Sequence, residues 1–429
     1  MKAEIIAIGS ELVGGQSLDT NSQWLSRALG DLGIPVHFHT SLGDDLGENV
    51  DVFRIAADRA DLVVTSGGLG PTQDDLTREA LARLAGVGLV EDPASLDAIA
   101  AMFARRNRPM AAMNRVQALL PEGAEPLPNA VGTAPGILMK VGRARFACLP
   151  GVPYEMKRMF AEQVEPRLRR DGLAARTIVH RKINLFGKGE SEVEAEALDL
   201  TARGRVPEVG ITASDATISF RISAEAGSRE EAARAILPTA ELIYARFADM
   251  IVGEGADDVA DALVRELVRA GRTIASAESC TGGLIAYRIT AIPGASRHFP
   301  GGVVTDSDGS KADLLGVPGS IIEAHGAVSA EVASEMAARV RERFGVDLGL
   351  AVTGNAGPGP GIPGDAVGLV YLGLSTAEKT QARKIEIGPE QPRDVIQSRA
   401  AKQAINWARL VLRGYPDRDQ TLLRPNTLA

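Results

Sequence analysis

Short apolar runs alternate with longer segments of helical periodicity through the first 170 residues. Residues 4–8 and 61–65 are apolar runs typical of buried strands, whereas residues 21–32 repeat leucine and alanine on one helical face. This alternation predicts a parallel sheet with helices on both faces, in a three-layer α/β/α domain. Ligands of such sheets bind at the carboxyl ends of the strands.

A smaller module is predicted after this domain. Its expected elements are strand 177–186, helix 190–200, strands 209–213 and 217–223, and helix 228–247. A βαββα module of this size is too small for an elaborate catalytic apparatus of its own, so we interpret it as a spacer or dimerisation module.

A second α/β pattern begins near residue 257. Its expected elements are strand 273–277, helix 284–290, and strands 348–352 and 367–374. The predicted boundaries are therefore 1–172 for the first domain, 173–253 for the middle module, 254–415 for a C-terminal α/β/α domain, and 416–429 for a tail that frays.

Composition narrows the class of protein. The 429 residues carry a net charge of −8, with 45% hydrophobic and 24% charged residues, as in soluble globular proteins. An acidic chain lacks the basic surface expected of a general nucleic-acid or membrane binder. Two distant cysteines, Cys148 and Cys280, exclude a disulfide framework, and no apolar run approaches ~18 residues, so we expect a cytoplasmic protein.

A glycine-rich turn follows the predicted strand 61–65. Missing side chains let backbone N–H groups approach a phosphate closely. The acids after the turn, Asp74 and Asp75, supply hard oxygen ligands suited to Mg²⁺, Mn²⁺ or Co²⁺. Alternatively, both acids only begin the next helix and interact with its dipole. The predicted phosphate-binding residues are Gly67, Gly68, Gly70 and Thr72, and Glu11, Asp19 and Asn21 are expected at the same rim.

The segment Ala-Glu-Ser-Cys-Thr-Gly-Gly, residues 277–283, lies between a predicted strand and a predicted helix. A hydroxyl there, on Ser279, is exposed at the sheet rim, but serine needs a base to act as a nucleophile. Lys311 is the candidate base, because a desolvated lysine can be neutral near pH 7. Alternatively, Ser279 only caps the helix and Lys311 is a solvated surface residue. Cys280 is a rival nucleophile, although a small apolar packing role suits it better.

These motifs, in this order, resemble those of the CinA family of competence- and damage-inducible proteins over about residues 1 to 415. The N-terminal half carries IGSELVGGQSLDTN, TSGGLGPTQDDLTREAL, GTAPG and LPGVPYEM. The C-terminal half carries AESCTGG, PGAS, GGVV, LLGVP, HGAVS and VTGNAGPG.

The resemblance implies a molybdopterin-binding-like N-terminal domain that hydrolyses ADP-ribose at its pyrophosphate with a divalent metal, assisted by K⁺. It implies a C-terminal amidohydrolase domain, without a cofactor, that converts nicotinamide mononucleotide to nicotinate mononucleotide and ammonia. Ser279 would be the acyl-forming nucleophile and Lys311 its base. A homodimer is also implied. By the same resemblance, the oxyanion hole would use the amides of Thr281, Gly282 and Gly283, and the nucleotide would contact Gly354, Asn355, Ala356, Gly357 and Gly359 within the loop 354–361.

The chain departs from the family pattern at four positions. Asp306 stands where the family usually has a tyrosine that assists proton transfer, and Asp308 adds a second acid near Lys311. Both carboxylates are expected to raise the pKa of Lys311 and to repel a phosphate. Asn355 replaces an apolar residue, and Gln73 replaces a histidine. The alternative function is therefore a nucleotide- or molybdopterin-binding protein that has lost the amidase.

Overall fold

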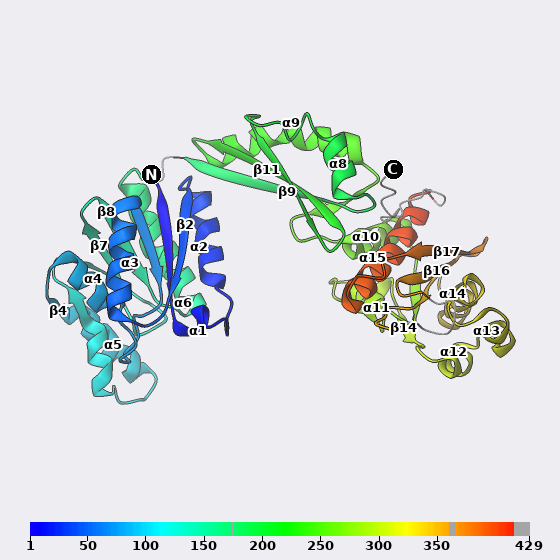
Figure 1. Cartoon of the computed structure of the whole chain (residues 1–429), viewed down its shortest axis with the longest axis horizontal. Coiled ribbons are helices and arrows are strands. Elements are labelled where there is room, and N and C mark those ends of the chain that lie inside the picture. Colours follow the sequence, from blue (N-terminus) through cyan, green and yellow to red (C-terminus); the bar gives the residue numbers. More distant parts are fainter. Residues whose placement is uncertain (174–175, 360–365, 416–429) are drawn as a thin grey trace. The chain divides into compact units, whose positions relative to one another are not determined.

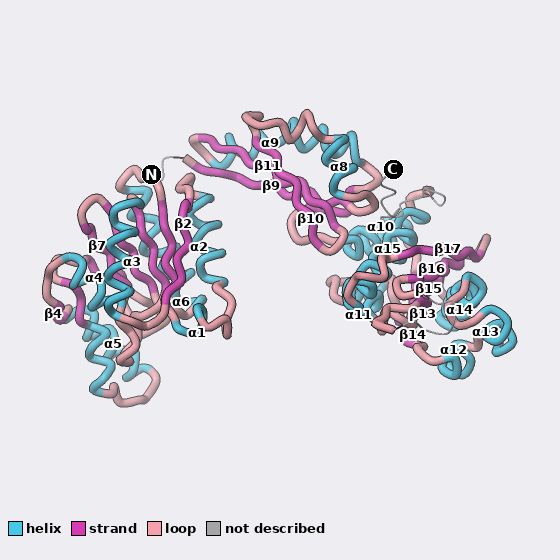
Figure 2. The backbone as a smooth tube through the Cα atoms, in the orientation of Figure 1, coloured by secondary structure: helices cyan, strands magenta, loops and turns pink. Residues whose placement is uncertain are grey.

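The computed structural model describes residues 1–173, 176–359 and 366–415. The chain divides into two compact units, Met1–Val179 with Glu225–Arg234, and His180–Ala224 with Ala235–Ala429. The predicted α/β class is confirmed, with helices on both faces of the larger sheets (Figures 1 and 2). The predicted fraying tail and residues 360 and 361 of the predicted nucleotide loop lie outside the described residues.

The N-terminal domain is built on a six-stranded sheet of order β2-β1-β3-β8-β7-β6. Its strands are β1 (Ala3–Ile8), β2 (Val36–Leu42), β3 (Leu62–Ser66), β6 (Glu125–Leu127), β7 (Gly136–Val141) and β8 (Ala144–Leu149). The prediction of a parallel sheet holds for β2, β1, β3 and β8 but is wrong for β7, which pairs antiparallel with both β8 and β6. The physical reason is the two-residue turn at Gly142 and Arg143, which can only join antiparallel strands.

Helices cover both faces of this sheet. They are α2 (Thr20–Asp31), α3 (Leu46–Arg59), α4 (Thr77–Ala85), α5 (Pro93–Arg105), α6 (Pro153–Met159) and α7 (Glu165–Arg170), with the single turn α1 (Ser10–Val13) and a small β4–β5 pair (Leu89–Glu91 and Leu119–Pro121). Ile5 of β1 packs in the core with α2 and α6, whereas Ile6 packs in the core with α3 and α4 (Figure 1). Burial on both faces explains the continuous apolar run of this strand.

The middle module has one strand more than predicted. Its elements are β9 (Thr177–Leu185), α8 (Glu190–Glu196), β10 (Glu208–Ser214), β11 (Thr217–Ala226), α9 (Arg229–Phe247) and β12 (Ile251–Glu254), with sheet order β10-β11-β9-β12. The segment that we predicted as a domain boundary therefore contributes β12. This strand is short, and Gly253 interrupts its register, so no alternating pattern marks it in the sequence.

The C-terminal domain has a five-stranded sheet of order β14-β13-β15-β16-β17. The strands β13 (Ile274–Glu278), β14 (Gly301–Val304) and β15 (Leu348–Gly354) are parallel, and β16 (Leu369–Ser375) and β17 (Thr380–Glu386) are antiparallel. One face packs on α10 (Val259–Ala270), α11 (Leu284–Thr290) and α15 (Arg393–Leu412), and the other on α12 (Asp308–Leu315), α13 (Gly319–His325) and α14 (Ala330–Phe344). The parallel strands end at the rim that carries Ser279.

The β10–β11 turn of the middle module is bound to the C-terminal domain. Asp215 accepts a hydrogen bond from Ser398 Oγ at 2.7 Å and forms ion pairs with Lys402 at 3.0 Å and Arg288 at 3.3 Å. The Lys402 side chain is only 4% exposed, whereas that of Asp215 is 39% exposed. The middle module therefore contacts the C-terminal domain through this turn.

Within the described ranges, no helix has both the length and the apolar content needed to cross a membrane.

Candidate functional site

Ser279 and Lys311 meet at the carboxyl end of β13. The amide of Ser279 donates to Val352 O of the neighbouring strand at 3.0 Å, which fixes the serine at the rim. Lys311 reaches it from α12, where its Nζ lies 3.3 Å from Ser279 Oγ and donates to the carbonyl of Asp306 at 3.0 Å. Lys311 is 1% exposed and Ser279 6% exposed. The alternative that Ser279 caps the helix and that Lys311 is a solvated surface residue is wrong, since Gly283 is the N-cap of α11 and Lys311 is buried.

Burial controls the charge of Lys311. Desolvation lowers its pKa below the ordinary lysine value, and the negative charges of Asp308 and Asp306 oppose this change. The two acids therefore act in the predicted direction, but burial outweighs them. Both carboxylates are exposed, so water screens them, while the amine itself is enclosed.

Glu278 is a residue that the sequence reasoning missed. Its carboxylate is 1% exposed and accepts hydrogen bonds from Thr281 Oγ1 at 2.8 Å and from the amides of Gly283, Ile285 and Ala286 at 2.9–3.1 Å. It therefore binds the first turn of α11 and fixes the loop that carries Ser279. Its signal in the sequence is an acid at the last position of a buried strand, directly before the serine.

The predicted oxyanion hole is only partly available in this conformation. The amide of Gly282 donates to Ser279 O at 2.9 Å, and the amide of Gly283 donates to Glu278. The amide of Thr281 has no acceptor among the described residues. Of the three predicted donors, Thr281 is thus the one free to receive a developing oxyanion.

Cys280 is held as a neutral thiol. Burial raises its pKa to about 12, with a further contribution from Asp306. A thiol with this pKa carries almost no thiolate at neutral pH, which argues against Cys280 as a nucleophile. Its carbonyl accepts a hydrogen bond from Gln397 of α15 at 2.8 Å.

The side chain of Asn355 forms hydrogen bonds within the loop after β15. The Asn355 side chain accepts from the amide of Gly357 at 2.8 Å and donates to Gly359 O at 3.2 Å, while Gly354 ends β15 and Ala356 is buried. Arg393, in the first turn of α15, donates to Gly357 O at 2.5 Å and its charge acts on the Cys280 thiol. Arg393 was not predicted, because it lies far along the chain in an ordinary helical segment.

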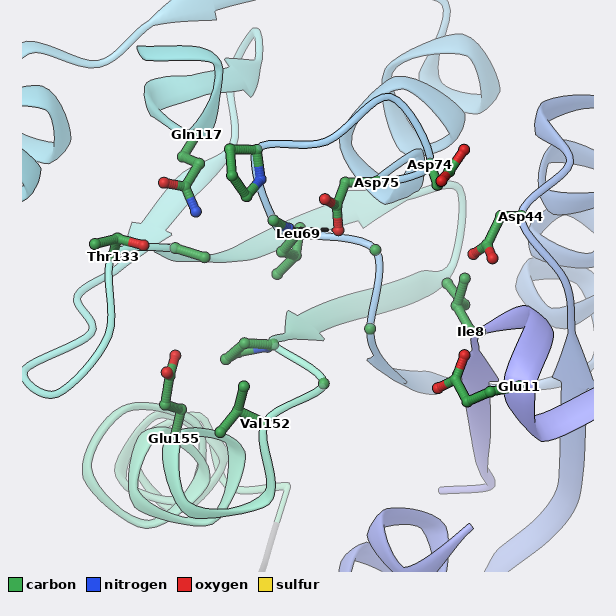
Figure 3. A pocket seen from close by; sticks show the side chains of 18 residues that line it. Ile8, Glu11, Asp44, Leu69, Asp74, Asp75, Gln117, Thr133, Val152 and Glu155 are labelled. Carbon is green, nitrogen blue, oxygen red and sulfur yellow. Dashed lines mark hydrogen bonds between the residues drawn. The ribbon is translucent and has the colours of Figure 1, made fainter. Parts of the chain in front are cut away.

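The glycine-rich turn of the N-terminal domain borders a cavity of about 440 Å³ (Figure 3). Figure 3 shows Glu11, Asp44 and Asp74 on one side of this cavity, and Thr133 and Glu155 on the other. Its lining includes five carboxylates, with Asp75 as the fifth, and contains no lysine or arginine. An anionic phosphate can bind among these acids only with a cation that offsets their charge.

Most of the backbone amides that we predicted to bind a phosphate already donate hydrogen bonds to acceptors within the protein. The amide of Gly67 donates to Leu149 O at 3.0 Å, and Asp75 accepts from the amides of Gly70 at 2.6 Å and Thr72 at 2.8 Å. Of the four predicted residues, only Gly68 keeps an amide without an acceptor in the described part of the chain. In this conformation Asp75 braces the turn, a role different from the metal ligation that we predicted.

Asp74 differs from Asp75 in its surroundings. Its side chain is exposed and lines the cavity, and α4 begins only at Thr77. The alternative that the two acids simply begin the helix is therefore wrong. Across the described residues, no three side chains of the ligand types gather to hold a metal ion on their own. Of the other rim residues, Asp19 caps α2, and Asn21 donates to Ser66 Oγ and Gly151 O.

Comparisons with known proteins cover all three parts of the chain. The family model described as "Probable molybdopterin binding domain" matches residues 4–170, and the model described as "Damage-inducible protein CinA KH domain" matches residues 180–253. The model described as "CinA C-terminal domain" matches residues 256–412.

Full-length relatives are also similar. A "CinA-like protein" of Frankia casuarinae is 42% identical over 435 residues, covering 98% of each chain. A "Putative competence-damage inducible protein" of Caldanaerobacter subterraneus subsp. tengcongensis is 41% identical, covering 96% of this chain and 99% of the relative. A crystal structure of a protein CinA of unknown function from Thermoplasma acidophilum is 34% identical over 40% of this chain and 96% of its own, with a TM-score of 0.35.

Proposed function

The chain belongs to the CinA family, and from this premise we propose that it is a bifunctional nucleotide hydrolase. Its C-terminal domain removes the amide nitrogen of nicotinamide mononucleotide, and its N-terminal domain hydrolyses ADP-ribose with a divalent metal. The observation that carries the first activity is the buried amine of Lys311 at 3.3 Å from Ser279 Oγ.

A serine–lysine pair is sufficient for amide hydrolysis. The neutral Lys311 amine accepts the proton of Ser279 as Oγ attacks the carboxamide carbon, and the Lys311 ammonium then gives that proton to the leaving nitrogen. Ammonia departs and an ester to Ser279 remains. Water then attacks the ester carbon and loses one proton to Lys311, which returns it to Ser279 Oγ as the ester bond to the serine breaks. The carboxylic acid so formed loses its remaining proton to solvent and leaves as nicotinate mononucleotide.

Two further groups support a mononucleotide amide as the substrate. The free amide of Thr281 can donate to the oxygen that gains charge as Ser279 attacks. Arg393 brings a positive charge to the same rim, where it can pair with the substrate phosphate. This cation offsets part of the repulsion that Asp306 and Asp308 exert on a phosphate.

Ammonia release tests the amidase. The full-length protein is incubated with nicotinamide mononucleotide, and ammonia and nicotinate mononucleotide are both quantified. The wild type should release both in equal amounts, and Ser279→Ala should release neither, while Cys280→Ala stays active. Equal background signals from the wild type and Ser279→Ala would reject the amidase and favour the alternative of a nucleotide-binding protein without this activity.

The acidic cavity of the N-terminal domain supports the pyrophosphatase. Asp74 is exposed to the cavity and is the carboxylate that we assign to the metal, with phosphate oxygens and water completing the coordination, as is usual for Mg²⁺. Mg²⁺, Mn²⁺ or Co²⁺, when bound, would neutralise phosphate charge and activate water, and K⁺ can add positive charge. The chain itself holds the turn through Asp75 and offers the Gly68 amide to a phosphate.

Release of AMP from ADP-ribose tests this second activity. The wild type should produce AMP and ribose 5-phosphate with a divalent metal and should lose this activity when the metal is chelated. Tight binding of ADP-ribose without turnover under any of the three metals would reject the pyrophosphatase and leave a binding function.

A further inference from the structure

A cavity of about 290 Å³ lies where the β10–β11 turn of the middle module meets helix α15; we call it the α15 cavity. Its lining comes from residues 188–190 at the start of α8, from residues 213–216 and 218 of the two strands and their turn, and from α15. All of these segments belong to one compact unit of the chain. Neither of the proposed activities uses this cavity.

The β10–β11 turn forms a shaped wall of the α15 cavity. Asp215 and Ala216 have φ angles of 46° and 60°, as both central residues of a two-residue hairpin turn of type I′ require. Glycine favours this conformation, yet position 216 carries a side chain. The Ala216 side chain packs against the core of the C-terminal domain, which explains why a residue with a methyl group stands there.

Arg399 lines the cavity without a hydrogen bond or an ion pair. Its Nε is buried and has no hydrogen-bond partner, and no ion pair joins the guanidinium to another residue in the described part of the chain. The pKa of the exposed Glu390 is lowered chiefly by its hydrogen bond with Gln391, and the charge of Arg399 contributes least. A guanidinium normally has hydrogen-bond partners, so Arg399 points to a ligand that carries an oxyanion.

The acids of the lining favour a ligand with a single negative charge. Asp215 is offset by its ion pairs with Lys402 and Arg288, whereas Glu190 is exposed to water. A dianion such as phosphate would be repelled by both acids more strongly than a monoanion. A carboxylate carries one charge and matches the planar guanidinium through two parallel hydrogen bonds.

The remainder of the lining suits an apolar body. Ala213, Ala216 and Ile218 contribute small or aliphatic side chains. Gln403 is 8% exposed and lies four residues after Arg399, on the same face of α15, where its amide can donate to a carboxylate oxygen. The volume is close to the lower limit of ligand pockets, which restricts the ligand to a small molecule.

We propose that the α15 cavity binds a small organic monocarboxylate. The carboxylate pairs with Arg399, and the apolar body contacts the β10–β11 turn, so that the ligand bridges the middle module and the C-terminal domain. The proposal is independent of the amidase and of the pyrophosphatase, because no residue of this cavity acts in either reaction.

Calorimetric titration of the full chain with three probes tests the class of ligand. Benzoate has both the carboxylate and the apolar body, benzamide has the same shape without the charge, and inorganic phosphate has the charge without the body. Benzamide and phosphate should bind at least ~10-fold more weakly than benzoate. Arg399→Gln should weaken benzoate binding at least ~10-fold, whereas Arg343→Gln, which removes the same charge at an exposed position of α14, should bind like the wild type.

A second pair of variants tests the location of the site. Ala213 and Thr212 are exposed neighbours on β10, and of the two only Ala213 lines the cavity. Successive residues of a strand point to opposite faces, so Ala213→Trp should fill the cavity and weaken benzoate binding, whereas Thr212→Trp should not. Circular dichroism confirms that the variants are folded.

The outcomes also separate this site from the amidase. Ser279→Ala should bind benzoate like the wild type, and loss of binding in this variant would place benzoate at the amidase site and overturn the proposal. Equal binding of benzoate by the wild type, Arg399→Gln and Ala213→Trp would overturn it too. Benzamide or phosphate bound as tightly as benzoate would contradict the assigned ligand class, and no binding of benzoate by the wild type would reject the site.

Discussion

The amine of Lys311 lies 3.3 Å from the hydroxyl of Ser279, although 32 residues separate them in the chain. Two parallel strands bring them together, since Ser279 follows β13 and Lys311 follows β14 at the same rim. The amine is enclosed while the acids near it face water, which allows it to lose its proton close to a nucleophile.

The pH dependence of the amidase should report the proton on Lys311. Because the reaction needs the neutral amine and burial lowers the pKa of Lys311, the rate should rise with pH and reach its plateau below the ordinary lysine pKa of 10.5. Asp308→Asn removes a charge that raises this pKa, so its rate should rise at lower pH than in the wild type. Asp313→Asn, an exposed change on the same helix, is the control and should keep the wild-type profile. A profile unmoved by Asp308→Asn would contradict the electrostatic argument.

Restoring the phenol at position 306 should increase amidase turnover. Asp306→Tyr removes a carboxylate that opposes deprotonation of Lys311 and adds a hydroxyl that can assist proton transfer. We expect an increase of about 10²-fold, the lower end for a positioned acid or base. Asp306→Phe is the matched control, because it removes the charge without adding the hydroxyl. Equal rates in both variants would show that the hydroxyl does not act.

Glu278 should be essential for the stability of the nucleophile loop. Glu278→Gln keeps the volume but replaces one acceptor by a donor, so it leaves at least one buried N–H of the α11 start unpaired. We expect a loss of ~2 kcal/mol or more in the unfolding free energy of the C-terminal domain, measured by urea denaturation. Glu323→Gln, an exposed change, should be neutral within about 0.5 kcal/mol. A neutral Glu278→Gln would contradict the assigned role of this carboxylate.

Substitutions of Asp74 and of Asp75 should have different effects on activity and on thermal stability. Asp74→Asn should abolish metal-dependent AMP release while thermal stability stays unchanged, because its side chain is exposed. Asp75→Asn should lower stability as well as activity, since its two oxygens hold the amides of Gly70 and Thr72. The reverse pattern, with Asp75→Asn stable and inactive, would assign the metal to Asp75. AMP release and thermal unfolding are measured on the same preparations.

Sequence patterns identified the element order and the rim on which the sites lie. They could not supply the direction of β7, because a two-residue turn sets it, nor the short strand β12. The Ser279–Lys311 pairing was predicted as a hypothesis, since spacing alone does not determine distance. The sequence did not predict the two residues that hold the C-terminal site in place, Glu278 and Arg393. Glu278 acts through backbone amides, and Arg393 reaches the rim only through the packing of α15.

The charge of Lys311 is the central claim and can be measured directly. The full chain is labelled with ¹³C at lysine Cε, and the Lys311 resonance is assigned by its loss in Lys311→Arg and followed by NMR from neutral to alkaline pH. The account predicts a resonance that titrates below the ordinary lysine pKa of 10.5 and moves to lower pH in Asp308→Asn. A resonance that titrates at or above 10.5, like a solvent-exposed lysine, would contradict the account.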